Sequence, residues 1–92
     1  DNSITENGFL YNYPHPGRNY TNIRYSLAEP SLISLKVYNL MGEYITSLEH
    51  GNRQQGEHEL IWNFENMPSG IYYCILEDYS HAISYRIKII IE

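Results

Sequence analysis

The sequence has little cysteine, little positive charge and no uninterrupted apolar run. Its single cysteine, Cys74, cannot form an internal disulfide, so a hydrophobic core has to hold the fold. Six Lys and Arg against eleven Asp and Glu give a net charge of −5. That balance excludes the basic footprint that nucleic acid or an anionic membrane requires of a partner. Arg86 and Lys88 interrupt the longest apolar stretch, so we expect no membrane-spanning segment.

The start of the chain is polar and has no targeting signal. Asp1-Asn2-Ser3 lacks the basic start and the apolar run of a signal peptide. No internal repeat, low-complexity stretch or composition shift divides the chain. We therefore expect residues 1–92 to form a single domain, either a mature protein or a piece of a longer one. Residues 1–8 would be a loose lead-in or linker.

Short segments rich in Tyr, Ile, Leu and Val predict an all-β protein, and no stretch has a sustained helical period. The predicted strands are 9–13, 21–27, 32–40, 43–48, 57–63, 71–76 and 82–92. Turn-forming or polar residues separate them at 14–17, 28–31, 39–42, 50–56 and 77–81, with Gly42 expected at positive φ. This spacing predicts an antiparallel β-sandwich of about seven strands, immunoglobulin-like or fibronectin type III-like.

Alternation along each strand predicts which side chains face the core. The inward set is Thr21, Ile23, Tyr25, Leu27, His58, Leu60, Trp62, Tyr72, Cys74 and Leu76. One face of segment 32–40 is shared by Ile33, Leu35 and Val37, and one face of segment 82–92 is shared by Ile83, Tyr85, Ile87, Ile89 and Ile91. Segment 71–76 is apolar on both of its faces, which predicts a central strand packed on both sides. Trp62, the largest apolar side chain, is expected to fill the centre of the core.

The turn before this central strand has its own signature. Pro68 fixes φ and Gly70 supplies a backbone conformation that other residues reach only with strain. The Tyr72-x-Cys74 pattern that follows is typical of a tyrosine corner, in which the Tyr hydroxyl bonds to backbone across a loop. We interpret Cys74 as a buried small hydrophobe and not as a reactive thiol.

The histidines do not predict a metal site. His15, His50 and His81 fall in turns or loops, and no pair has the close spacing of metal ligands. Only His58 falls on an inward face, where we expect it to bond to backbone at a sheet edge. The sequence therefore predicts no metal and no cofactor.

Other polar groups also have structural interpretations. Glu57 and Glu59 share a face that nothing desolvates, so a solvated pair is favoured over an acid–base pair. Glu77-Asp78 offers too few oxygen ligands for a calcium loop. Ser69 lies outside any Gly-x-Ser-x-Gly pattern, and the glycosylation sequon at Asn19 is attributed to chance. We expect no catalytic residue.

Five motifs occur in order along the chain. They are Asn12-Tyr13-Pro14-His15-Pro16; Thr21, Ile23, Tyr25 and Leu27; Leu35, Val37, Tyr38, Asn39, Leu40 and Gly42; Gly56, His58 and Trp62; and Met67-Pro68-Ser69-Gly70-Ile71-Tyr72. With these motifs the chain from about Leu10 onward resembles the C-terminal sorting domains of the type IX secretion system. Those domains are in turn close to the immunoglobulin-like domain of flagellar hook-capping proteins. Two departures are Gly17, where the family often has Phe, and the ending Ile91-Glu92, where members often have a basic residue.

The resemblance implies a non-catalytic sorting and cell-surface attachment module at the C-terminus of a larger exported bacterial protein. Its implied partner is the outer-membrane secretion machinery, met after passage through the periplasm. By resemblance residues 70–92 matter most, and the candidate recognition strand is Tyr85, Arg86, Ile87, Lys88 and Ile89. Two alternatives remain open: a self-associating extracellular subunit that pairs through edge strands, and an accessory carbohydrate-binding domain.

Overall fold

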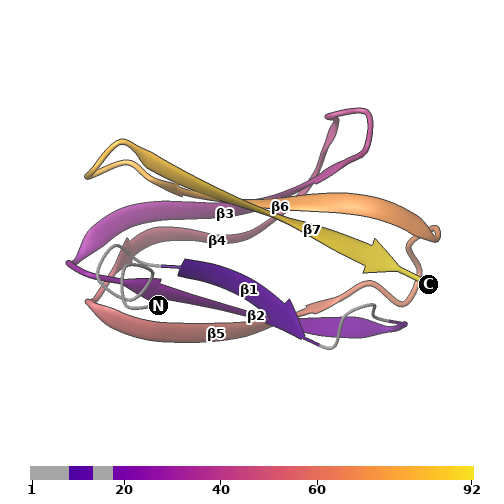
Figure 1. Cartoon of the computed structure of the whole chain (residues 1–92), viewed down its shortest axis with the longest axis horizontal. Coiled ribbons are helices and arrows are strands. Elements are labelled where there is room, and N and C mark those ends of the chain that lie inside the picture. The colour runs from indigo at the N-terminus through magenta and orange to yellow at the C-terminus, as the bar shows by residue number, and fades with distance from the viewer. Residues whose placement is uncertain (1–8, 14–17) are drawn as a thin grey trace.

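A computed structural model describes residues 9–13 and 18–92 (Figure 1). It contains seven strands: β1 (Phe9–Tyr13), β2 (Tyr20–Leu27), β3 (Ser31–Asn39), β4 (Tyr44–Arg53), β5 (Gly56–Asn63), β6 (Gly70–Asp78) and β7 (Ile83–Ile91). The expected lead-in at 1–8 and the turn at 14–17, with Pro14, lie outside the described residues.

The strands form two antiparallel sheets that pack face to face (Figure 1). Sheet A has the order β1-β2-β5, and sheet B has the order β4-β3-β6-β7. Each inward face is apolar, and the outward face of sheet A is mostly polar, as antiparallel layers covered on one side require. The outward face of sheet B is mixed, because Ile71, Tyr73 and Ile75 of β6 lie beside its polar side chains. The prediction of an immunoglobulin-like sandwich of about seven strands is confirmed.

The core lies between the sheets and is made by the alternating inward positions. Its buried hydrophobic side chains are Ile23, Tyr25, Leu27, Ile33, Leu35, Val37, Trp62, Phe64, Tyr72, Cys74, Leu76, Ile89 and Ile91. Trp62 packs edge-on against Phe64, with ring centroids 4.9 Å apart, and against Tyr72 at 6.0 Å. These edge-to-face contacts add to the burial of large aromatic surface. The aromatic cluster joins β5 of sheet A to β6 of sheet B.

Strand β6 is central, since it pairs with β3 on one side and β7 on the other. Its inward side chains are buried, but Tyr73 and Ile75 on the opposite face are half exposed. The expectation that this strand packs on both faces is therefore wrong. A two-layer sandwich has only one inner space, so outward apolar side chains of β6 are covered only by neighbours such as Arg86, which lies over the Tyr73 ring.

The turn before β6 contains the predicted tyrosine corner. The Tyr72 hydroxyl donates a 2.8 Å hydrogen bond to the carbonyl oxygen of Pro68. Gly70 has φ 150°, a conformation that strains any residue with a Cβ. Cys74 is fully buried, and this burial raises the pKa of its thiol to about 12. The thiol is therefore protonated and unreactive at neutral pH.

Two predicted loops are shorter in the structure. Strand β4 continues to Arg53, so residues 50–53 are strand and not exposed loop. Backbone pairing with β3, in which Gly51 lies opposite Ile33, satisfies the donors and acceptors of this polar segment. Glu77 and Asp78 likewise belong to the end of β6 and not to the turn. Apolar periodicity is a poor guide where an edge strand is polar on both faces.

The aromatic cluster gives a stability prediction. Trp62→Ala should lower the free energy of unfolding by about 3–5 kcal/mol, because it empties a large volume between Phe64 and Tyr72. Chemical denaturation of the purified chain measures this difference. Ile61→Ala, at a neighbouring side chain that is 63% exposed, is the control and should change stability by about 0.5 kcal/mol or less. Equal stability of the two variants would contradict a central role for Trp62.

Candidate functional site

The candidate recognition strand is β7, at the edge of sheet B. Among the described strands it pairs with β6 alone, and its residues alternate between core and surface. Ile89 is buried and Tyr85 and Ile87 are packed against the core, whereas Arg86 and Lys88 are exposed on the outer face. The inward side chains therefore fix the strand, while two cations face outward. The Arg86 guanidinium lies 5.1 Å from the centroid of the Tyr73 ring, in cation–π contact.

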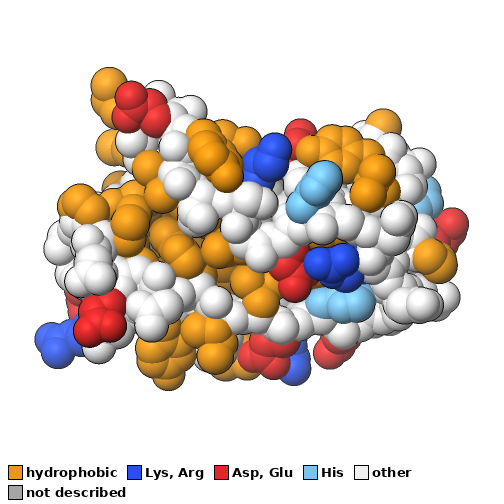
Figure 2. All heavy atoms as spheres, turned by 180° about the vertical axis from the view of Figure 1, so that it is seen from behind, with side chains coloured by type: hydrophobic (Ala, Val, Ile, Leu, Met, Phe, Trp, Pro, Cys, Tyr) orange, Lys and Arg blue, Asp and Glu red, His pale blue; other side chains and the backbone are white. Residues whose placement is uncertain are grey.

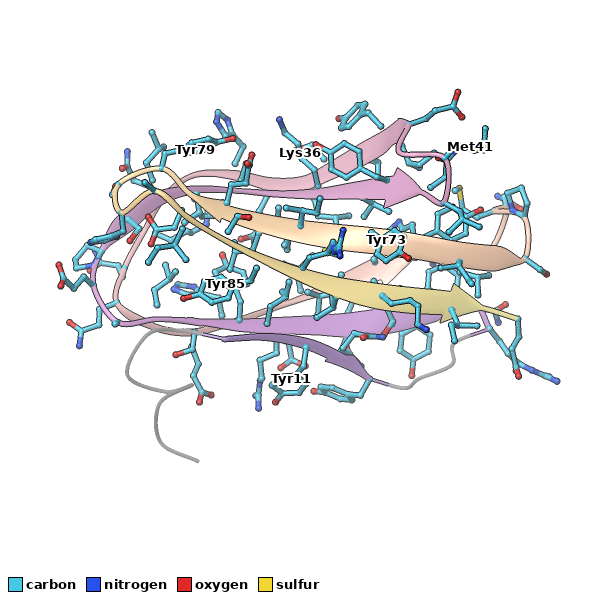
Figure 3. The ribbon with its side chains drawn as sticks, turned by 45° about the horizontal axis from the view of Figure 1, so that its top comes forward. Tyr11, Lys36, Met41, Tyr73, Tyr79 and Tyr85 are labelled. Carbon is cyan, nitrogen blue, oxygen red and sulfur yellow. The ribbon has the colours of Figure 1, made fainter. Side chains whose placement is uncertain are left out.

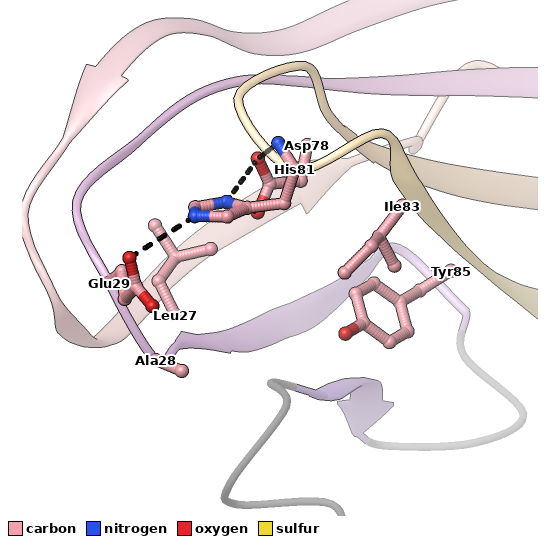
Figure 4. A pocket seen from close by; sticks show the side chains of 7 residues that line it. All are labelled: Leu27, Ala28, Glu29, Asp78, His81, Ile83 and Tyr85. Atoms are coloured by element: carbon pink, nitrogen blue, oxygen red, sulfur yellow. Dashed lines mark hydrogen bonds and ion pairs between the residues drawn. The ribbon is translucent and has the colours of Figure 1, made fainter.

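A polar cluster closes one end of the sandwich (Figure 4). His81 Nδ1 lies 2.9 Å from Asp78 Oδ2, and His81 Nε2 lies 3.3 Å from Glu29 Oε1. Ser31 and Asp78 are buried, and Ser31 Oγ lies 3.1 Å from Asp78 Oδ2. Together with Leu27, Ile83 and Tyr85, these carboxylates and the imidazole line a hollow of about 130 Å³. The cluster links the turn after β2 to the turn after β6 and so joins the two sheets.

The arrangement of this cluster does not suit nucleophilic catalysis. A Ser-His-Asp triad needs one imidazole nitrogen on the nucleophile and the other on the carboxylate. Here Ser31 and Asp78 both contact Nδ1, and Nε2 faces Glu29. Hydrogen bonds to Asp78 and then to Glu29 raise the pKa of His81 above its ordinary value, because both carboxylates favour the charged ring. The cluster is therefore suited to hold two turns together. Sequence analysis missed it, because Glu29 and His81 are far apart in the chain.

A second polar contact crosses between the sheets near β5. The buried Tyr25 hydroxyl donates a hydrogen bond to Glu49 on β4, and burial followed by this bond raises the pKa of Tyr25. Glu49 also accepts a 3.3 Å bond from Arg53 Nε. His58 stacks on the Tyr25 ring at 5.1 Å, and its Nε2 lies 2.8 Å from the carbonyl oxygen of Gln54. Figure 2 shows a face on which acidic, basic and histidine side chains gather beside apolar atoms.

His58 thus has the backbone partner expected at a sheet edge, since β5 ends sheet A. In the part of the chain that the structure describes, no three His, Cys, Asp or Glu side chains are placed to share a metal ion. Over the same residues, no helix is long and apolar enough to cross a membrane.

The remaining motif residues lie at different depths. Tyr13 is 41% exposed and bonds through its hydroxyl to Glu59, so it is a surface residue and not part of the core. Glu57 and Glu59 are both exposed, and Glu59 also lies 3.4 Å from Arg24 Nη2. Tyr38 is half-buried on the outer face of sheet B. Gly42 has φ 85° in the hairpin between β3 and β4, where its amide donates to the Asn39 carbonyl.

The His81 cluster predicts a pH dependence of stability. The raised pKa of His81 means that the folded state binds its proton more tightly than the unfolded state. The contribution of protonated His81 to folding stability is complete at pH values below the ordinary histidine pKa of about 6.5. It is lost as the pH rises through the raised pKa of His81 in the folded state. His81→Gln should therefore lower the melting temperature at pH about 6 and much less at pH about 9. The exposed His50→Gln is the control. A His81→Gln deficit that is equal at every pH would contradict a protonated ring.

Comparison with known proteins places the chain in a family. A search of curated proteins finds no match. The model of the secretion system C-terminal sorting domain matches residues 12–92, a range that contains β2 to β7 entirely and the end of β1. The match confirms the resemblance seen in the five sequence motifs, and the chain belongs to the family of secretion system C-terminal sorting domains.

Proposed function

We propose that this chain is a non-catalytic module that directs a larger bacterial protein through the outer-membrane secretion machinery and serves its attachment to the cell surface. The observation that carries the proposal is the family match over residues 12–92, which supports a C-terminal sorting signal domain of an exported protein. The destination is the cell surface or the medium, reached through the periplasm.

The placement of the motif residues indicates what the machinery would recognise. Ile23, Leu35, Trp62 and Tyr72 are buried, so a receptor cannot touch their side chains without unfolding the domain. Their role is to build the sandwich, and Tyr72 in particular fixes the start of β6 through its bond to Pro68. Recognition would then depend on the folded surface, with β7 and its exposed cations as the candidate contact.

The structure gives less support to self-association through edge strands. Strand β7 does have one unpaired side in its sheet, which is the feature that edge pairing needs. However, Ile89 and Ile91 are buried in the domain's own core and are not offered to another subunit. The exposed Arg86 and Lys88 would also repel the same strand of a second copy. We therefore propose sorting, which the family match supports, ahead of self-association.

The proposal predicts export of an attached protein. A reporter with a signal peptide and this chain at its C-terminus should reach the surface or medium of a bacterium with a type IX secretion system. The same reporter without the chain should stay in the periplasm, because nothing would connect it to the outer-membrane machinery. Cell fractionation with protease shaving measures the distribution. A mutant host without the translocon is the second control. A fusion that stays periplasmic in the competent host would refute the proposal.

A further inference from the structure

The cations of this acidic chain are divided between two kinds of environment. Arg18, Arg24 and Arg53 each have a carboxylate partner, at 3.8, 3.4 and 3.3 Å respectively. The other three cations are Lys36, Arg86 and Lys88, and none of them forms an ion pair with any described residue. All three lie on the outer face of sheet B. Three of the six Lys and Arg residues thus lie on one face without a carboxylate partner among the described residues.

Strand register brings these cations together around aromatic rings. Lys36 lies opposite Ile75, which in turn lies opposite Arg86. In the next row Tyr38 lies opposite Tyr73, which lies opposite Lys88. We call this surface, made of Lys36, Tyr38, Tyr73, Arg86 and Lys88, the cationic face. Figure 3 looks toward it, with Lys36 and Tyr73 labelled.

The surroundings of the cationic face are apolar on one side. A shallow hollow beside the β3–β4 hairpin is lined by Tyr38, Leu40, Tyr73, Ile75 and Arg86. At the hairpin tip Leu40 is 61% exposed and Met41 is 84% exposed. Cations beside half-buried Tyr and exposed Leu and Met give the mixture of Arg, aromatic and apolar side chains that is enriched in protein–protein interfaces.

We propose that the cationic face and the Leu40-Met41 tip dock onto a carboxylate-bearing surface of a partner protein that the domain meets during export. Partner carboxylates would pair with Lys36, Arg86 and Lys88, and apolar side chains would cover the hollow and the tip. This inference rests on the proposed sorting function and assigns the contact to one surface. It extends the contact from β7 across β6 and β3, which sequence analysis did not include.

Other occupants fit this surface less well. A second copy bound through the same face would bring cation against cation. A glycan needs free polar groups for its hydroxyls, but the Asn39 side chain is already bonded to Glu43 and to the Met41 amide. A uniformly anionic bilayer would also meet Glu43, next to the tip, and Glu77, beyond Ile75, whereas a protein surface can place its carboxylates opposite the three cations alone.

Two variants with equal change of net charge test the inference. The first is Lys36→Gln with Arg86→Gln and Lys88→Gln, which removes three positive charges from the cationic face. The control is Tyr20→Glu with Ile61→Glu and Asn66→Asp, which adds three negative charges at exposed positions away from that face. Each is placed in the reporter fusion with a photocrosslinking amino acid at Ser84, an exposed position on the outer side of β7. Thermal melting of the purified domains checks that both variants fold.

The expected result is that the wild type and the control form a crosslink to a partner protein and are exported. The glutamine variant should crosslink roughly tenfold less, because it has lost its electrostatic steering, and its export should fall with it. Equal crosslinking and export of a folded glutamine variant would overturn the inference and leave sorting intact. A wild-type fusion that is not exported would instead refute the sorting function. Binding of the purified domain to phosphatidylglycerol vesicles, abolished in the glutamine variant, would also overturn the inference in favour of a membrane.

Discussion

The fold depends on how the chain crosses from sheet A to sheet B between Trp62 and Tyr72. Tyr72 acts twice in this crossing: its ring packs at 6.0 Å from Trp62, and its hydroxyl bonds to the Pro68 carbonyl. The hydrogen bond alone contributes about 1 kcal/mol, but it fixes the direction in which β6 leaves the turn. Because β6 pairs with both β3 and β7, an error in its direction would displace three of the four strands of sheet B.

This dependence explains why several residues of the five family motifs are buried in the core. Side chains such as Leu35 and Trp62 are buried, so their contribution to sorting is the shape that they maintain. At the opposite end of the sandwich, Asp78, His81 and Glu29 hold the turns after β2 and β6 together. The contact of Tyr72 with Trp62 therefore fixes the start of β6, and the polar cluster around His81 fixes its end. The register of β7 along β6 follows from both.

Local sequence signals predicted those parts of the fold that depend on local geometry. Period-two alternation located the inward residues of β2, and the Tyr72-x-Cys74 spacing predicted a hydroxyl bond to backbone, which the structure shows at the Pro68 carbonyl. The errors arose where pairing overrides local pattern. Residues 50–53 read as loop because they are polar, yet β3 supplies their hydrogen bonds. The contact between Glu29 and His81 spans 52 positions, and no spacing rule connects residues so far apart.

The distribution of charge separates residues that hold the fold from residues that remain available to a partner. Arg53 donates a hydrogen bond to Glu49, which also accepts a hydrogen bond from the Tyr25 hydroxyl. The positive charge of Arg53 is therefore paired within the domain. Arg86 has no carboxylate partner within residues 9–13 and 18–92, and it lies over the Tyr73 ring, which contacts the guanidinium without neutralising its charge. An ion pair of Arg86 with its own chain would have added little stability at an exposed site. The absence of such a pair therefore costs the domain little folding stability. The positive charge of Arg86 stays available to a partner on the same face as Lys36 and Lys88.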